Sequence, residues 1–240
     1  MPKPTPKKVA GKVTSPPSQA DFNKRPLGKY CRTVTGIFRR LHVINPETSQ
    51  PWPPIYFSTA GYTRFDPVRG IGTMCVGESL GGAMMEKFDD FWGPAGDDSR
   101  NVTETQLRET WETLVFLPGV QLFDATGKNL SLIGIDAQFA TGEYAITREW
   151  ALRMIFHPDE IDGILFPSRH DLQRKNIALF GRPRFSKAPR YDPHLSLANI
   201  ATWNANSADA GQLIFGPEQV LEHHPELDAT LDELVVGILP

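Results

Sequence analysis

The stretch GTMCVGESLGGAMMEKF, residues 72–88, joins a short apolar strand directly to a helix. Its first part, Gly72 to Gly77, places four apolar or strand-forming residues between two glycines, which is typical of a short buried strand. Ser79 has a side chain that often caps a helix, because its hydroxyl oxygen can accept a hydrogen bond from a free backbone N–H of the first turn. The sequence therefore predicts a strand that runs straight into a helix.

The predicted helix has two different faces. Three apolar side chains share one face because they are spaced four residues apart: Leu80, Met84 and Phe88. Glu86 falls on the opposite face, together with Gly82. A glycine inside a helix costs up to about 1 kcal/mol relative to alanine, so its presence here indicates a close approach. Glu86 faces either solvent or a cleft, and its small neighbours favour a cleft that admits a ligand or another backbone.

Outward from this unit, short strands and helices follow one another without a regular βα alternation. Strand signals occupy residues 36–41, 120–123, 130–135, 163–166, 176–180 and 235–239. Helix signals occupy residues 101–116, 142–156, 218–223 and 227–234, with starts near Thr103 and Thr141 for the first two. The sequence predicts an α+β fold with a mixed, largely antiparallel β core and flanking helices.

The 240 residues are sufficient for one domain with a buried core. Hydrophobic residues make up 40% of the chain and charged residues 22%, as in ordinary soluble globular proteins. Residues 1–26 carry six basic residues against one acidic residue and show no apolar periodicity. We expect residues 1–27 to be a disordered basic tail and residues 28–240 to form the domain.

The rest of the chain carries 27 acidic and 19 basic residues, which argues against direct binding of nucleic acid. No apolar run approaches the roughly 20 residues that span a bilayer, and the N-terminus lacks the apolar segment of a signal peptide. Cys31 and Cys75 are too few for a disulfide framework and fit a reducing compartment. We therefore expect a cytoplasmic protein with no membrane contact.

Several common functional motifs are excluded. Residues 72–79 have the outline of a phosphate-binding P-loop, but Glu78 stands where that loop needs lysine, and its charge would repel phosphate. No histidine or cysteine has a partner at a zinc-like spacing, so we expect no metal site. The absence of a Gly-x-Ser-x-Gly elbow leaves a hydrolase triad without support.

Two further patches each carry one polar group among glycines and apolar residues. Arg64 lies in the stretch GYTRFDP, and Ser168 lies in DGILFPSR. Taken singly, each has an ordinary structural interpretation: Arg64 can form a surface pair with Asp66, worth about 0–1 kcal/mol, and Ser168 can cap a helix or form a turn. Together with Glu86, they would bring a cation, a carboxylate and a hydroxyl to one pocket. Such a set could grip and split a phosphorylated nucleoside.

In this order, the arginine, glutamate and serine patches resemble the RES domain family, which is named after these three residues. The resemblance is carried by four stretches and more loosely by Arg39; the stretches are residues 61–67, 72–86, 150–168 and 176–180. It is strongest over residues 30–182, and residues 183–240 would form a C-terminal extension.

The resemblance implies a single domain similar to ADP-ribosyltransferase toxins, with a mixed α/β core around an NAD site. It implies an enzyme similar to NAD phosphorylases and NAD glycohydrolases, which cleaves the nicotinamide–ribose bond of NAD by phosphorolysis or hydrolysis. NAD is then the substrate and inorganic phosphate a co-substrate, with no further cofactor. The resemblance also implies a toxin of a toxin–antitoxin pair, neutralised by a helix-turn-helix antitoxin protein, and it is compatible with a homodimer.

The family's three named residues fit this chemistry. Glu86 would stabilise the oxocarbenium-like charge that develops on the ribose, or hold a ribose hydroxyl. Arg64 would hold the pyrophosphate or an attacking phosphate, because its planar fork matches phosphate oxygens. Ser168 would donate a hydrogen bond to a phosphate or ribose oxygen.

Cys75 departs from the family pattern, because the family usually has a tyrosine on the strand before the glutamate helix. A cysteine in the NAD site cannot stack on a nicotinamide ring or supply a phenol hydroxyl, whereas Tyr62 could substitute from a neighbouring element. As a side chain, Cys75 is expected to be a small buried hydrophobe rather than a reactive nucleophile. Two alternatives stay open: a RES-like module that binds NAD or a nucleotide with altered catalysis, and an ADP-ribosyltransferase that modifies a macromolecule.

Overall fold

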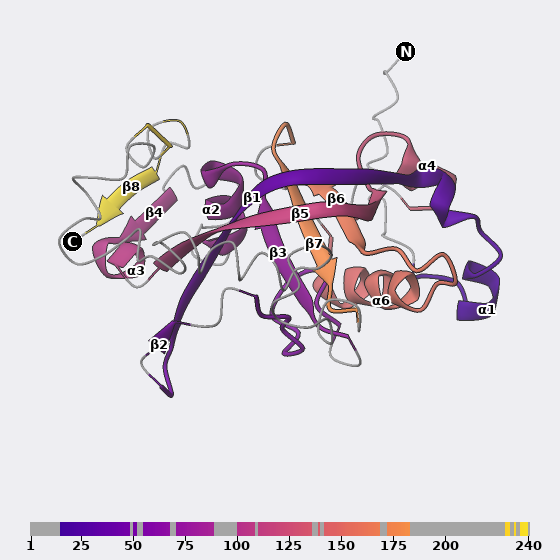
Figure 1. Cartoon of the computed structure of the whole chain (residues 1–240), viewed down its shortest axis with the longest axis horizontal. Coiled ribbons are helices and arrows are strands. Elements are labelled where there is room, and N and C mark those ends of the chain that lie inside the picture. Colours follow the sequence, from indigo (N-terminus) through magenta and orange to yellow (C-terminus); the bar gives the residue numbers. More distant parts are fainter. Residues whose placement is uncertain are drawn as a thin grey trace, which may run out of the picture.

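The computed structural model describes residues 15–48, 50–51, 55–67, 71–88, 100–108, 110–135, 139, 142–168, 172–182, 229–230, 233 and 236–239. The helices are α1 (Gln19–Phe22), the 3-10 helix η1 (Leu27–Tyr30), α2 (Leu80–Lys87), α3 (Glu104–Arg108), α4 (Asn129–Leu132) and α6 (Tyr144–Ile155). The strands are β1 (Cys31–Asn45), β2 (Gln50–Pro51), β3 (Thr73–Gly77), β4 (Arg100–Thr103), β5 (Thr110–Asp124), β6 (Gly163–Pro167), β7 (Lys175–Phe180) and β8 (Val236–Leu239). In Figure 1 the long strands β1 and β5 run side by side across the molecule.

The strand pairings close the main sheet into a ring. β1 pairs with β3, β3 with β7, β7 with β6 and β6 with β5, and β5 returns to pair with β1. These pairings are antiparallel except for the parallel pair of β5 with β6. The short β2 pairs antiparallel with the end of β1, and a separate two-stranded sheet pairs β4 with β8 in parallel. The predicted α+β class, with a mixed and largely antiparallel core, is confirmed.

Most other predicted elements are also present within the described residues. The unit of residues 72–88 is β3 followed by α2, and the helix predicted over residues 142–156 is α6. The remaining strand signals correspond to parts of β1, β5, β6, β7 and β8. The expected cap Thr141 and the helix at 218–223 lie outside the described residues. Of the helix expected over 227–234, residues 229, 230 and 233 are described and helical.

The long helix predicted over residues 101–116 is wrong. Thr103 does begin a helix through a capping box: its hydroxyl oxygen accepts from Gln106 N–H at 3.1 Å, and its own N–H donates to Gln106 Oε1 at 2.8 Å. This helix is α3, which ends after five residues, and β5 begins at Thr110. The segment is long-range sheet rather than helix because every residue of β5 except Gly119 has a strand partner on β1 or β6.

Pro118 and Gly119 form a β-bulge inside β5. The register changes from Val34↔Val120 to Thr35↔Pro118, which leaves Gly119 as the extra residue. Gly119 has a φ of 88°, a conformation that other residues rarely adopt. Two residues that commonly end an element are therefore accommodated within one strand.

The strand predicted over residues 130–135 is wrong as well, because α4 and a turn occupy this segment. The backbone N–H groups of Ile133 and Ile135 both donate to the carbonyl of Leu130, at 3.2 and 2.9 Å. All three of these side chains are buried, whereas the intervening Leu132 is 54% exposed. The apolar spacing is thus satisfied by a tight turn over the core rather than by a pleated strand.

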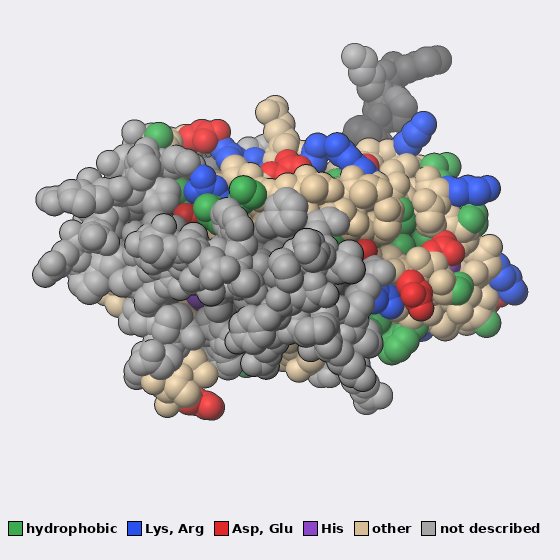
Figure 2. All heavy atoms as spheres, viewed as in Figure 1, with side chains coloured by type: hydrophobic (Ala, Val, Ile, Leu, Met, Phe, Trp, Pro, Cys, Tyr) green, Lys and Arg blue, Asp and Glu red, His purple; other side chains and the backbone are tan. Residues whose placement is uncertain are grey.

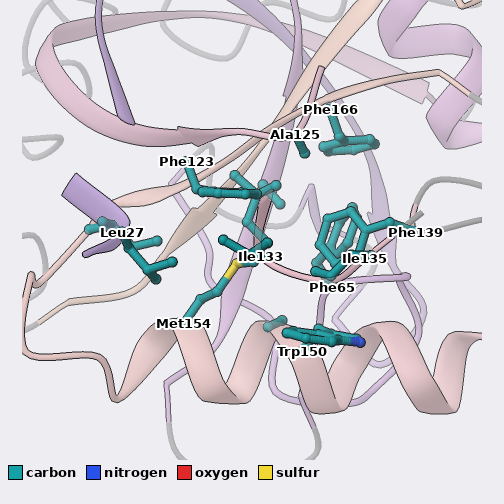
Figure 3. Close-up of a cluster of buried hydrophobic side chains, with 14 of the residues drawn as sticks. Leu27, Phe65, Phe123, Ala125, Ile133, Ile135, Phe139, Trp150, Met154 and Phe166 are labelled. Atoms are coloured by element: carbon teal, nitrogen blue, oxygen red, sulfur yellow. The ribbon is translucent and has the colours of Figure 1, made fainter. Parts of the chain in front are cut away.

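Two hydrophobic clusters lie on the two sides of the closed sheet. One cluster takes side chains from all five strands of the ring, which places it inside the ring. Its buried members are Phe38, Met74, Val76, Val115, Leu117, Val120, Leu122, Leu165, Ile177 and Leu179. The other packs α6 against the outer face of the sheet. Figure 3 shows Trp150 and Met154 of α6 pointing toward Phe65, Phe123 and Ile133.

Residues 15–27, which we expected to belong to a disordered tail, pack against the domain. Phe22 and Leu27 are fully buried in the cluster under α6, and the Phe22 ring meets Trp150 edge-on with centroids 5.6 Å apart. Arg153 Nε donates to the carbonyl of Pro17 at 3.0 Å. Two isolated apolar side chains produce no periodicity in the sequence, so their burial against the domain cannot be predicted from a local pattern. Residues 1–14 lie outside the described residues.

The described part of the surface carries no single charged face in the view of Figure 2, where basic and acidic side chains are interspersed. Among the described residues, no helix has the length and apolar character needed to cross a membrane.

Candidate functional site

Helix α2 carries Glu86 and lies very close to the strand that precedes it. Ser79 caps the helix as predicted, with its hydroxyl oxygen accepting from Gly82 N–H at 3.1 Å. A Cβ atom at Gly77 would lie only 2.6 Å from the backbone nitrogen of Ala83. Because Gly77 has no side chain, the helix can fold back directly onto β3. This close approach holds Glu86 beside the sheet.

Glu86 is half-buried and faces strand β7. Its Oε1 accepts a hydrogen bond from Asn176 Nδ2 at 3.1 Å, and Asn176 is fully buried. A Cβ atom at Gly82 would lie 3.0 Å from Asn176 Oδ1. The small residue on the Glu86 face of the helix therefore admits the Asn176 side chain, and the backbone carbonyl oxygen of Lys175 would lie 3.8 Å from the same Cβ. The expected ligand cleft at this face stays a prediction.

Cys75 lies next to Glu86 on the outer face of the sheet. Gly77 pairs with Asn176, and Cys75 pairs with Ala178, which belongs to the cluster under α6. Because paired residues share a face, Cys75 and Asn176 both point to the side where α2 and α6 lie. The candidate site is therefore on the outside of the ring, between the two helices.

The thiol of Cys75 is surrounded by ionisable groups. Burial raises its pKa to about 12; the charge of Glu86 and, more weakly, that of Asp66 act in the same direction, while a hydrogen bond with the Thr63 side chain and the charge of Arg40 oppose them. A thiol with so high a pKa stays protonated at neutral pH and is a poor nucleophile. This raised pKa agrees with the expectation that Cys75 is not a reactive nucleophile, whereas the residue is partly buried and not the fully buried hydrophobe that we expect.

Arg64 is held by the N-terminal end of α6. Its Nη1 donates to the carbonyl oxygen of Gly142 at 2.5 Å, and its guanidinium carbon lies 4.6 Å from the centre of the Tyr144 ring. The carbonyl of Arg64 accepts from the Thr147 hydroxyl at 2.8 Å. Arg64 is only 6% exposed, so it is a fixed, buried cation rather than a surface residue.

Asp66 shapes the loop that presents Arg64. Its carboxylate accepts from the backbone N–H of Gly61 at 3.0 Å, and also from Tyr62 N–H and the Ser58 hydroxyl. Burial raises the pKa of Asp66, and these hydrogen bonds partly offset that shift. The alternative of an exposed Arg64–Asp66 pair is wrong, because both residues are buried.

Ser168 follows β6 and is fully buried. Its hydroxyl lies 3.6 Å from the sulfur of Met85, the residue before Glu86, and its N–H donates to the carbonyl of Arg174 at 2.9 Å. The serine therefore directly follows the last residue of β6, at the start of the β6–β7 connection. It lies against the side of α2.

The structure places these predicted site residues around α2 and the start of α6. Ser168 contacts the residue next to Glu86, and Cys75 connects Glu86 to Thr63, the neighbour of Arg64. The Tyr62 side chain is 78% exposed and points away from the core. Among the described residues, no cluster of three His, Cys, Asp or Glu side chains could hold a metal ion.

A family model of the RES domain matches residues 38–199 of the chain, more than half of its length. The chain belongs to the RES domain family. The match includes Arg64, Cys75, Glu86 and Ser168, and it reaches further toward the C-terminus than the stretch of 30–182 expected from the motifs.

A solved structure resembles the chain weakly. It is a chain in the crystal structure of the M. tuberculosis MbcT–MbcA toxin–antitoxin complex, with 11% sequence identity and a TM-score of 0.49. The similarity covers 65% of this chain and 81% of that chain. No curated protein matches the sequence.

Sequence reasoning missed two polar residues of this RES domain site. Asn176 was noted only as the start of a strand, and its contact with Glu86 joins residues 90 positions apart. Arg148 of α6 was not singled out, although its Nε donates to the carbonyl of Thr63 at 2.9 Å. Asn176 and Arg148 each place a polar side chain on a strand or helix that packs mainly through apolar residues. This contrast is the sequence feature by which each residue could have been selected.

Proposed function

We propose that this RES domain is an NAD-consuming enzyme that cleaves the nicotinamide–ribose bond, with phosphate or water as the acceptor. The observation that carries the proposal is the placement of Glu86: its carboxylate is fixed by Asn176 beside the outer face of the sheet. Membership in the RES family supplies the expectation of NAD as substrate. The arrangement of the other residues supports the same chemistry.

Glu86 is the group suited to the developing positive charge. As the nicotinamide leaves, the ribose acquires oxocarbenium character, and a carboxylate held in place stabilises it without reorganisation. Asn176 holds one carboxylate oxygen, and the negative charge of Glu86 would act on the sugar ring or a ribose hydroxyl. Nicotinamide is a good leaving group, so correct positioning contributes more than a strong nucleophile. The neutral thiol of Cys75 fits this scheme, because the scheme requires no thiolate.

Arg64 supplies a fixed positive charge on the other side of Cys75. A buried guanidinium that is already oriented by Gly142 and Tyr144 loses little side-chain entropy when it binds an anion. It would hold a phosphate group of the dinucleotide or the attacking phosphate. Ser168 would support the position of α2 and offer its hydroxyl to the substrate.

The proposal includes the biological setting that the family resemblance implies. The protein would act in the cytoplasm as the toxin of a toxin–antitoxin pair, with a helix-turn-helix antitoxin as its partner and a homodimer as a compatible state. Expression of the chain alone should then stop bacterial growth and deplete cellular NAD. Co-expression of the protein encoded by the adjacent reading frame should restore both.

The direct test is release of nicotinamide from NAD by the purified protein, measured with and without inorganic phosphate. We expect turnover in the wild type, and loss of at least about 100-fold in Glu86→Gln, because the variant keeps the shape but lacks the charge. The control is Glu149→Gln on the exposed side of α6, which should keep full turnover. Equal activity in Glu86→Gln and wild type would refute the assignment of this site.

Cys75 favours one alternative function, a module that binds NAD without cleaving it. Calorimetric titration that detects NAD binding, together with no nicotinamide release over hours, would establish this alternative. Label from NAD that appears on protein or nucleic acid, rather than in free ADP-ribose species, would instead indicate an ADP-ribosyltransferase.

A further inference from the structure

Arg148 is a second cation near Arg64 to which the proposed function assigns no role. It lies on α6, and its guanidinium carbon is 5.3 Å from the centre of the Tyr144 ring. Its Nε donates to the carbonyl oxygen of Thr63, the residue before Arg64. The Arg148 side chain therefore connects the start of α6 to the 61–66 loop.

The two guanidinium groups lie close enough to act on one anion. The guanidinium carbons of Arg64 and Arg148 lie 4.6 and 5.3 Å from the centre of the same Tyr144 ring. The two carbons therefore cannot be more than 9.9 Å apart. Even this upper bound is comparable to the Debye length, which is about 10 Å at 0.1 M ionic strength and about 8 Å at physiological ionic strength, so the fields of the two cations overlap in the region between them. The carboxylate of Asp66 also acts within range of Arg148, which leaves the group of three with a net positive charge.

Arg148 differs from Arg64 in how accessible its donors are. Arg64 is buried, whereas Arg148 is partly exposed. Within the described part of the chain, the hydrogen bond of Arg148 to Thr63 uses Nε alone, and the two terminal nitrogens make no further hydrogen bond. A guanidinium fixed through Nε presents its two terminal N–H groups as a planar fork, the geometry that binds phosphate oxygens in pairs.

From this geometry we infer that Arg148 and Arg64 together form a phosphate-binding subsite flanking Tyr144, with Arg148 as the residue that contacts the phosphate from the solvent side. The inference rests on the proposed function for its substrate. The shared ligand chemistry is a phosphate group, which comes either from the diphosphate bridge of the dinucleotide or from free inorganic phosphate as the acceptor.

The test compares Arg148→Ala with a matched control on the same helix, Arg153→Ala. Arg153 also donates through Nε to a backbone carbonyl, at 3.0 Å, but its partner is Pro17, and Arg153 lies in the last turn of α6 rather than near its start. Steady-state nicotinamide release is measured with NAD and phosphate varied in turn. We expect Arg148→Ala to raise one of the two KM values about tenfold to 100-fold, with kcat changed less than about threefold. Arg153→Ala should leave both KM values unchanged.

The substrate whose KM rises identifies the source of the phosphate. An increase for NAD assigns the subsite to the diphosphate bridge, and an increase for inorganic phosphate assigns it to the acceptor. Arg148→Lys separates binding from structure, because it keeps the charge but loses the fork. Partial recovery of the same KM in Arg148→Lys supports phosphate contact. A loss of kcat with both KM values unchanged would show that Arg148 only ties α6 to the loop and would overturn the inference.

A binding measurement keeps this inference separate from the proposed function. Calorimetric titration with inorganic pyrophosphate and with inorganic phosphate requires no turnover. If the wild type binds either anion and Arg148→Ala weakens that binding at least tenfold, the subsite stands even where no nicotinamide is released. If the wild type binds neither anion, or if Arg148→Ala and Arg153→Ala bind equally well, the inference is overturned. Unfolding curves of both variants establish that the protein compared is folded.

Discussion

Replacement of Asn176 by alanine should disable the candidate site without unfolding the protein. The 3.1 Å hydrogen bond from Asn176 Nδ2 helps to orient the Glu86 carboxylate. A hydrogen bond to a charged group contributes about 1.5–3 kcal/mol. If this contribution is realised when the ribose charge develops, Asn176→Ala lowers kcat/KM of nicotinamide release by about tenfold to about 150-fold.

The cost in stability should be smaller than the cost in activity. Asn176 Oδ1 is buried and has no hydrogen-bond partner among the described residues, so the wild type already carries the cost of one buried acceptor. Alanine removes that acceptor together with the donor. We expect the free energy of unfolding, measured in urea, to fall by about 1–2 kcal/mol, which is within the range of ordinary substitutions.

Asn176→Asp perturbs the same contact by charge instead of by truncation. Two carboxylates about 3 Å apart repel by on the order of 5 kcal/mol at an effective dielectric constant of about 20. The pair would hold a proton to a higher pH, so the acidic limb of the pH–rate profile should move upward.

Asn129→Ala is the matched control. Asn129, the first residue of α4, also donates through Nδ2 over 3.1 Å, but its acceptor is the carbonyl of Asp124, and we place no site residue there. Its kcat/KM should equal that of the wild type. Full activity in Asn176→Ala, or an equal loss in Asn129→Ala, would refute the role that we give to Asn176.

Three further outcomes test the packing around the site. Gly77→Ala should lower the free energy of unfolding in urea by about 1–3 kcal/mol, because the new Cβ would lie 2.6 Å from Ala83 N. The control Gly28→Ala, whose new Cβ would have its nearest contact at 3.6 Å, should change the free energy of unfolding by less than about 0.5 kcal/mol. The thiol of Cys75, with a pKa of about 12 in place of 9.0, should react with a thiol reagent at pH 8 about 10³-fold more slowly in the native protein than in urea, and an equal rate would contradict the buried environment. Phe22→Ala should cost about 3–5 kcal/mol in the same unfolding assay if residues 15–27 belong to the folded domain, and a loss below about 1 kcal/mol would show that they do not.

Local chemistry explains which parts of the fold can be predicted from the sequence. The β3–α2 unit is predictable because its signals are adjacent in the chain: a short apolar run, the Ser79 cap and apolar residues at helical spacing. The α6 helix follows from its apolar stripe in the same way. By contrast, the choice of strand for residues 110–116 depends on pairing with β1, some 70 residues away, and no local pattern encodes that partner.

The candidate site shows the same division. Arg64, Glu86 and Ser168 can be selected because each stands in a short motif of unusual composition, and the family resemblance orders them. Asn176 cannot be selected in this way, because it becomes a partner of Glu86 only when β7 pairs with β3. The contacts of Arg64 with α6 are likewise invisible in the sequence, where an exposed pair with Asp66 is an equally good interpretation.

Gly82 separates the requirements of the site from those of the fold. In the interior of α2 this glycine costs up to about 1 kcal/mol relative to alanine, and Gly82→Ala recovers that amount. The new Cβ would lie 3.0 Å from Asn176 Oδ1, so the asparagine must shift by a few tenths of an ångström. The two effects on stability oppose each other, and we expect the urea midpoint to stay close to that of the wild type.

The same shift in Gly82→Ala moves Asn176 Nδ2 relative to Glu86, so kcat/KM should fall several-fold while stability is kept. A fall in stability of more than about 2 kcal/mol, with activity per folded molecule unchanged, would show that the glycine serves packing alone. Retained stability with lost activity would instead mean that a glycine unfavourable to the helix is required because the Glu86 carboxylate must meet strand β7.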